Sequence, residues 1–153
     1  MDERQFADSW EINNRINLYL LDAIDSDGLK CQSASKGRSV GEQFAHLHNV
    51  RLMWLKVAAP DLLKGLKKLE ETGDGKLLRK SLVASSKAVG DLLVKSAVNG
   101  GKVKGFKPHV AAFLCYLVSH ESHHRGQIML SLKQSGKPVD KKVSYGLWEW
   151  GVR

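Results

Sequence analysis

Four long stretches with helical hydrophobic periodicity, and no convincing strand pattern, constrain the fold of this 153-residue chain more than any other feature. Loops rich in Gly and Ser separate some of them, and Pro60 is expected to open a short additional helix. The pattern predicts an all-α protein, a single-domain antiparallel four-helix bundle over residues 1–153. The four stretches cover about residues 3–24, 39–57, 75–98 and 109–133.

Local signals mark the ends of two of these stretches. S-V-G-E opens the second as a capping box, in which the Ser39 hydroxyl and the Glu42 carboxylate each accept a hydrogen bond from an N–H at the helix start. Pro108 opens the fourth, and Gly136 and Pro138 follow it as stop signals. The sequence therefore predicts where both helices begin and where the last one ends.

The composition excludes several classes of protein. A hydrophobic content of 42% and a charged content of 26% are typical of soluble globular proteins. No stretch approaches the roughly 18 apolar residues that a membrane helix needs. The opening MDERQFADSW is too polar for a signal peptide, so a cytoplasmic location is expected. Cys31 and Cys115 lack C-x-x-C spacing and are expected to be reduced thiols.

The net charge of +8 raises the question of nucleic-acid binding. The lysines are dispersed along the chain, without interleaved aromatic residues and without helix-turn-helix or zinc-finger spacing. A solvated basic face is therefore expected, with no specific nucleic-acid partner. The same charge can draw an anionic small substrate toward a cleft.

The segment SHESHHRGQIML holds three of the six histidines. On a helix that turns about 100° per residue, His120 and His124 continue the face begun by Phe113, whereas Glu121 and Arg125 turn away from it. Two imidazoles at this spacing can reach one metal ion, although the H-E-x-x-H motif is absent. A pair of hydrogen-bonded core histidines is the alternative. A metal site needs a third ligand from another helix.

The second expected helix offers this ligand in FAHLHNVRLMWL. His46 shares its face with Met53 and Trp54, which we interpret as the interior side, and His48 points about 200° away. His46 is therefore the candidate third ligand. A core histidine that is bonded to a neighbouring helix remains the alternative.

Three motifs together resemble the DinB-like (DinB/YfiT-like) superfamily over nearly the whole chain: S-V-G-E-Q-F-A-H-L, H-E-S-H-H-R-G-Q-I and Y-G-L-W-E-W. The resemblance implies a bundle of up-down-down-up order, often a homodimer. It also implies one divalent metal ion held by His46, His120 and His124. His123 occupies the variable position of the motif, and Gln127 matches its glutamine. Some relatives are thiol-dependent transferases, which implies a low-molecular-weight thiol as the small-molecule partner.

Three neutral imidazoles leave an open coordination position and suit Zn, Ni, Fe or Cu. An ion at such a position lowers the pKa of bound water to about 7 or holds a thiol as thiolate. A metal-dependent thiol S-transferase or hydrolase is expected, with its catalytic residues unknown. A non-catalytic metal-binding stress or damage-response protein is the alternative. Candidate helpers, each with a structural or surface role as the alternative, are His48, Glu121, His123 and Gln127.

The tail VSYGLWEWGVR carries too much aromatic surface to be left in water. Two placements are open. The tail covers the end of the bundle or a partner subunit, or it folds back beside the histidine helices and walls the metal cleft. Its large side chains are Tyr145, Leu147, Trp148 and Trp150.

Overall fold

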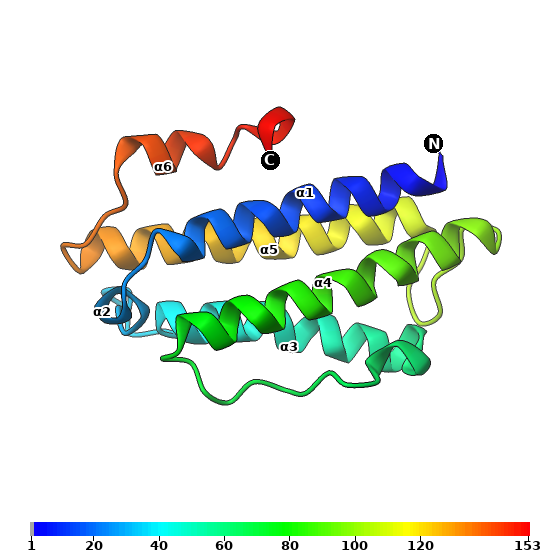
Figure 1. Ribbon diagram of the computed structural model, residues 1–153, viewed down its shortest axis with the longest axis horizontal. Helices are drawn as coiled ribbons and strands as arrows, with labels where there is room; N and C mark the ends of the chain where they lie inside the picture. The colour runs from blue at the N-terminus through cyan, green and yellow to red at the C-terminus, as the bar shows by residue number, and fades with distance from the viewer. Residues whose placement is uncertain (1) are drawn as a thin grey trace.

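The computed structural model describes residues 2–153; Met1, the first residue of the predicted domain, lies outside the described residues. Four long helices lie side by side (Figure 1), and no strand occurs in residues 2–153, which confirms the prediction of an all-α protein. None of these helices is both long and apolar enough to cross a membrane. The long helices are α1 (Glu3–Asp22), α3 (Val40–Ala58), α4 (Gly75–Val98) and α5 (Val110–Gln134).

The chain runs in one direction along α1 and α5 and in the other along α3 and α4 (Figure 1). Because α3 and α4 run the same way, residues 59–74 must return along the length of the bundle between them. Pro60 opens only the short 3₁₀ helix η1 (Pro60–Leu63), and the rest of this segment has no regular structure. The expected short helix is thus limited to a single turn.

The predicted capping box opens α3. The Ser39 Oγ accepts from the Glu42 N–H at 3.1 Å, and the Glu42 Oε2 accepts from the Ser39 N–H at 2.6 Å. At α5 the residue after Pro108 is the cap, because the His109 Nδ1 accepts from the Ala112 N–H at 3.2 Å. Side chains therefore satisfy N–H groups that the helices themselves leave without partners.

Three short elements lie in segments for which the sequence predicted no helix. Two of them begin at a side-chain cap and the third has none: Asp25 accepts from the Gly28 N–H at 2.7 Å, and Asp140 accepts from the Val143 N–H at 2.9 Å. A four- or six-residue helix is too short to display a period of 3.6 residues. The elements are α2 (Ser26–Leu29), α6 (Lys141–Gly146) and the 3₁₀ helix η2 (Trp150–Val152).

Two apolar clusters fill the interior, and a layer of polar side chains separates them. One cluster contains Trp10, Leu55 and Phe113, and the other contains Phe44 and Ile128. In the space between the two clusters, all four long helices contribute residues to what we call the buried polar layer. Its members are Asn13, Asn14 and Asn17 of α1, Arg51 of α3, Ser85 of α4, and Glu121 and Arg125 of α5.

Glu121 is the centre of the buried polar layer. Its carboxylate accepts from Arg51 Nε at 2.7 Å and from Arg51 Nη2 at 3.0 Å. The side-chain amides of Asn13 and Asn17 donate to the same carboxylate, each at 2.7 Å. The prediction that Glu121 and Arg125 turn away from the interior was therefore wrong: their exposed fractions are 1% and 8%. Charged side chains that are hydrogen-bonded inside the bundle made these inward positions appear outward in the sequence.

Candidate metal centre

The structure brings together the three histidines that the sequence singled out. His46 comes from α3, and His120 and His124 come from α5. Their ligand nitrogens all lie within 4.8 Å of one another. The ring centroids are 4.6 Å apart for His46 and His124, 4.7 Å for His120 and His124, and 5.3 Å for His46 and His120. These three residues can hold a metal ion between the two helices.

The three rings lie on the flank of the bundle rather than at its centre. His124 is buried, while His46 and His120 are half-buried. The predicted interior face of α3 was wrong, because Met53 is 51% exposed and the buried side of the helix carries His48. The face was predicted from apolar residues, but α3 turns His48 and Arg51 inward. The rings nevertheless meet, because the histidines of α5 also lie on a flank.

His48 has a structural role. It is 1% exposed, and its Nε2 and Nδ1 lie 2.8 Å from the Lys67 carbonyl oxygen and 3.1 Å from the Ser81 carbonyl oxygen. Burial is the main cause that lowers the pKa of His48, against hydrogen bonds to the two carbonyls that raise it. The ring ties α3 to the return segment and to α4. It is therefore not a helper at the metal centre.

A hydrogen bond between the two helices orients His124. Its Nδ1–H donates to the Oε1 of Gln43, a side chain that is 6% exposed. With Nδ1 carrying the proton, the lone pair lies on Nε2, where it can bind a metal ion. The sequence analysis assigned no role to Gln43. Its position three residues before a candidate ligand is the signal that could have identified it.

All three imidazoles are neutral at neutral pH. Burial, followed by the charges of His120 and His46, lowers the pKa of His124 to about 4. Burial is also the largest cause that lowers the pKa of His46, with Arg38 second. The pKa of His120 is lowered by burial against the opposing carboxylate of Glu121. Each ring therefore keeps a lone pair for a metal ion.

The donor set and its spacing fit a divalent transition metal. Metal–nitrogen bonds of about 2.0–2.1 Å in a tetrahedral site put ligand nitrogens roughly 3.3 Å apart. The nitrogens here lie within 4.8 Å, so small rotations of the half-buried rings of His46 and His120 bring them to that spacing. Three imidazoles without a carboxylate suit Zn, Ni, Fe or Cu better than Mg or Ca.

A polar cavity of about 400 Å³ is linked to the histidine cluster through Gln43, which lines the cavity and bonds His124, although no histidine lines the cavity itself. Gln43 lines it from α3, Gln127 from α5, and Arg38 from the segment before α3. Arg38 is near enough to contribute to the lowered pKa values of all three histidines. It is also the only charged side chain in the lining. The cavity can therefore receive a polar molecule with an anionic group.

Aromatic side chains flank the other side of the site. The ring of Tyr116 stacks on His120 with an interplanar angle of 16° and a centroid distance of 6.5 Å. Trp54 packs edge-on to both Tyr116 and Phe106, with the Trp54 ring 5.6 Å from the Tyr116 ring. An aromatic cluster therefore borders the metal centre beside His120.

The remaining helper candidates have different positions. Glu121 lies in the buried polar layer and is committed to Arg51. His123 is exposed, and its ring centroid lies 5.1 Å from that of His124. Gln127 is exposed and lines the polar cavity. Of the four candidates, only Gln127 lines this polar cavity.

The tail lies away from the histidines. In Figure 1, α6 and η2 follow α1 and α5 on the side opposite to α3. Tyr19 of α1 holds the tail: the Arg153 guanidinium lies 3.7 Å above its ring centroid, and its hydroxyl donates to the Lys142 carbonyl oxygen at 3.5 Å. The placement of the tail as a wall of the metal cleft is therefore wrong, and the tail covers a flank of the bundle instead.

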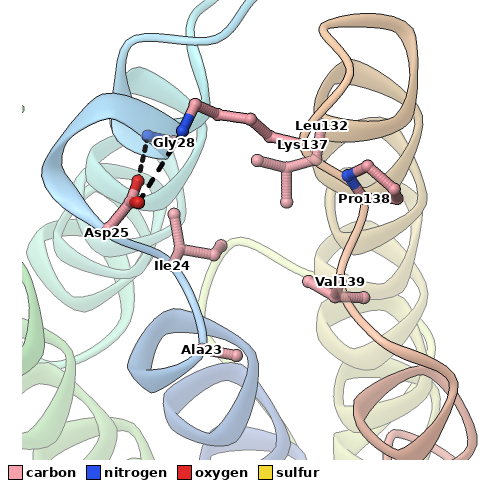
Figure 2. Close-up of a pocket in the computed structure, with 8 residues that line it drawn as sticks. All are labelled: Ala23, Ile24, Asp25, Gly28, Leu132, Lys137, Pro138 and Val139. Carbon is pink, nitrogen blue, oxygen red and sulfur yellow. Dashed lines mark hydrogen bonds and ion pairs between the residues drawn. The ribbon is translucent and has the colours of Figure 1, made fainter.

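A smaller cavity of about 230 Å³ lies at one end of the bundle, between α2 and the segment that follows α5 (Figure 2). The Asp25 carboxylate accepts from the Gly28 N–H and pairs with Lys137 at 3.7 Å. Its charged groups thus satisfy one another, and no histidine lines it. It is not part of the metal centre.

A helical bundle with three neutral histidines that converge from two helices defines the class of histidine-rich metal-binding bundles. The sequence model of the DinB family matches residues 1–147, and the chain belongs to this family. No curated protein and no solved structure matches the chain.

Proposed function

We propose that this protein is a metal-dependent enzyme that binds one divalent ion through His46, His120 and His124 and acts on a low-molecular-weight thiol. The convergence of three neutral imidazoles, one of them bonded to a side chain that lines a polar cavity, carries this proposal. S-transfer to an electrophile is the leading reaction, and hydrolysis is the second.

A bound divalent ion supplies an open coordination position that favours the deprotonated form of a thiol. The side chains of this chain do the rest. Gln43 fixes the tautomer and orientation of His124 through the Nδ1 hydrogen bond. Arg38 pairs with an anionic group of the substrate, because its guanidinium can donate two parallel hydrogen bonds to a carboxylate. Gln127 donates to polar groups on the α5 side of the cavity.

The cavity favours a small polar thiol over a large apolar substrate. Its volume of about 400 Å³ is within the range of small-molecule sites. Its polar side chains come from both α3 and α5, and the guanidinium of Arg38 provides the only charge in the lining. A thiol that carries a carboxylate matches this arrangement, because its sulfur and its charge can be held at two points.

Elemental analysis of the purified protein tests the metal site. Wild-type protein is expected to carry about one divalent ion per chain, since the site offers one set of three ligands. His120→Ala and His124→Ala should lose it, while His123→Ala, a neighbouring histidine outside the set, is the matched control. Full metal retention in both ligand variants would overturn the site.

Assays of metal-loaded protein with bacillithiol, mycothiol and glutathione against electrophiles test the reaction. Arg38→Gln should raise KM for a carboxylate-bearing thiol more than it lowers kcat, because Arg38 binds the substrate and does not touch the reacting atoms. Lys36→Gln, a nearby exposed cation outside the cavity lining, is the control. Bound metal without turnover of any thiol or ester would favour a non-catalytic metal-binding protein.

A further inference from the structure

A second cavity, of about 460 Å³, lies between α5 and the C-terminal tail. Its lining on α5 recurs at Val118, Ser122 and Met129, a spacing that follows one helical face. His120 and His124 lie on roughly the opposite side of the same helix. The cavity is therefore separate from the candidate metal centre.

Arg125 lines this cavity and has hydrogen-bond donors to spare. The residue is 8% exposed, and its Nη1 donates to the Oδ1 atoms of Asn13 at 2.8 Å and Asn17 at 2.6 Å. Its Nε and Nη2 make no hydrogen bond to residues 2–153, and neither nitrogen is fully enclosed by protein. Three of the five N–H donors of the guanidinium, on these two nitrogens, therefore remain for an acceptor in the cavity.

The charges of the buried polar layer do not balance. The layer holds two guanidinium groups, on Arg51 and Arg125, and one carboxylate, on Glu121. Arg51 forms the ion pair with Glu121 at 2.7 Å, and Arg125 has no ion-pair partner among residues 2–153. An uncompensated buried charge is costly, so an anion beside Arg125 would stabilise the layer. The hydroxyls of Ser122 and Ser144 also line the cavity and add donors.

The rest of the lining is apolar. Leu147, Trp148 and Trp150 of the tail face Val118 and Met129 across the cavity. A concave, mostly apolar space with a few convergent polar groups is the usual form of a small-molecule site, and the volume fits a ligand with one ring and a short chain.

We propose that this cavity binds a small monocarboxylate with an aromatic or branched aliphatic body. Its carboxylate accepts hydrogen bonds from Nε and Nη2 of Arg125, and its apolar body packs against Trp150 and Met129. The site requires neither the metal ion nor the thiol chemistry proposed for the opposite face of α5.

The charge requirement is tested with 3-phenylpropionate and its neutral amide, 3-phenylpropionamide, as probes of nearly equal shape. Titration calorimetry gives the affinity, and the fluorescence of Trp148 and Trp150 reports on the cavity. The acid should bind about tenfold or more tightly than the amide, because only the acid forms charge-assisted hydrogen bonds with Arg125.

The location is tested by filling the cavity without touching the buried polar layer. A Cβ added at Gly126, which lines the cavity, meets no heavy atom within 4 Å, so Gly126→Leu should fold and occupy the space. Ser119→Leu, at an exposed position of α5 outside the cavity lining, is the matched control. Gly126→Leu should abolish binding of the acid, Ser119→Leu should retain it, and the metal content should be the same in both.

Four results would overturn the proposal. Equal affinities of the acid and the amide would show that Arg125 does not select an anion. Unchanged binding in Gly126→Leu, or no binding of the acid to wild-type protein, would show that the cavity is not the site. A dimer detected by sedimentation that buries Trp148, which is 80% exposed in the single chain, and that excludes the acid would assign the cavity to a second copy.

Discussion

The Nδ1–H of His124 donates to the Oε1 of Gln43, and this bond joins the two helices that carry the candidate metal ligands. Gln43 is buried beside the site, so no water molecule readily replaces it. An acceptor at this position both fixes the ring and raises the basicity of the ligand nitrogen.

Gln43→Leu should therefore weaken metal binding by roughly 10- to 100-fold, the usual effect of losing such a partner. The affinity is measured by competition with a chelator. Gln43→Glu, which keeps an acceptor at the same reach, is the control and should bind at least as tightly as wild type. An unchanged affinity in Gln43→Leu would mean that the bond does not orient the ligand.

His46 and His48 should differ in what their loss affects. His46→Ala removes a half-buried ring that is a candidate ligand. It should release the metal with little change in the free energy of unfolding. His48→Ala should keep the metal and lower the free energy of unfolding by about 1–3 kcal/mol, because the buried carbonyl that accepts from the ring N–H, that of Lys67 or Ser81, loses its donor. Metal analysis and urea unfolding of both variants separate the two roles, and metal loss only in His48→Ala would reverse the assignment.

The same two residues show how far the sequence could predict the site. The spacing of His120 and His124, together with the family motif, was sufficient to select three histidines that the structure brings together. The face of α3 was not predictable from hydrophobicity, because Arg51 and His48 are buried with partners on other helices, whereas Met53 is exposed. Hydrophobic periodicity predicts that apolar residues face the interior. The prediction fails where a charged side chain is buried with hydrogen-bond partners.

The fold was more predictable than the site because it depends on repeated local signals. The box of Ser39 and Glu42 and the long apolar periods gave the four helices within one or two residues. The course of the tail was not predictable. It is decided by contacts with Tyr19, more than a hundred residues away in sequence, and these have no period of their own.

Metal retention should persist in mild acid. The pKa values of His46 and His120 lie below their ordinary 6.5, and that of His124 falls to about 4. Because a lowered pKa keeps each ring neutral to a lower pH, protons compete with the metal less than at ordinary histidines, and at His124 they compete strongly only toward pH 4. Bound metal after buffer exchange across this range measures the competition. Complete release already near pH 6.5 would contradict the lowered pKa values.

The last prediction concerns the ion pair between Glu121 and Arg51 in the buried polar layer. Both side chains are 1% exposed, and Arg51 also donates to the carbonyl oxygen of Leu82 at 2.9 Å. Glu121→Gln keeps the shape of the side chain but leaves the guanidinium without its counter-charge. The free energy of unfolding should fall by about 3–5 kcal/mol, the usual cost of removing one partner of a buried pair.

The double variant Arg51→Met/Glu121→Leu tests whether this loss comes from the stranded charge. This variant removes both charges. Its loss of free energy of unfolding should be smaller than the sum of the losses in the single variants Arg51→Met and Glu121→Leu, because no charge is left unpaired.

The dependence of stability on acid provides a second measurement. Burial opposes ionisation of Glu121, but Arg51 and the two asparagines keep its pKa below the ordinary 4.5. Its contribution to stability is therefore present above pH 4.5 and is lost as the pH falls through the lowered value, a dependence that Glu121→Gln should lack. Additive losses in the double variant, with an unchanged acid profile in Glu121→Gln, would mean that packing rather than charge pairing stabilises this layer.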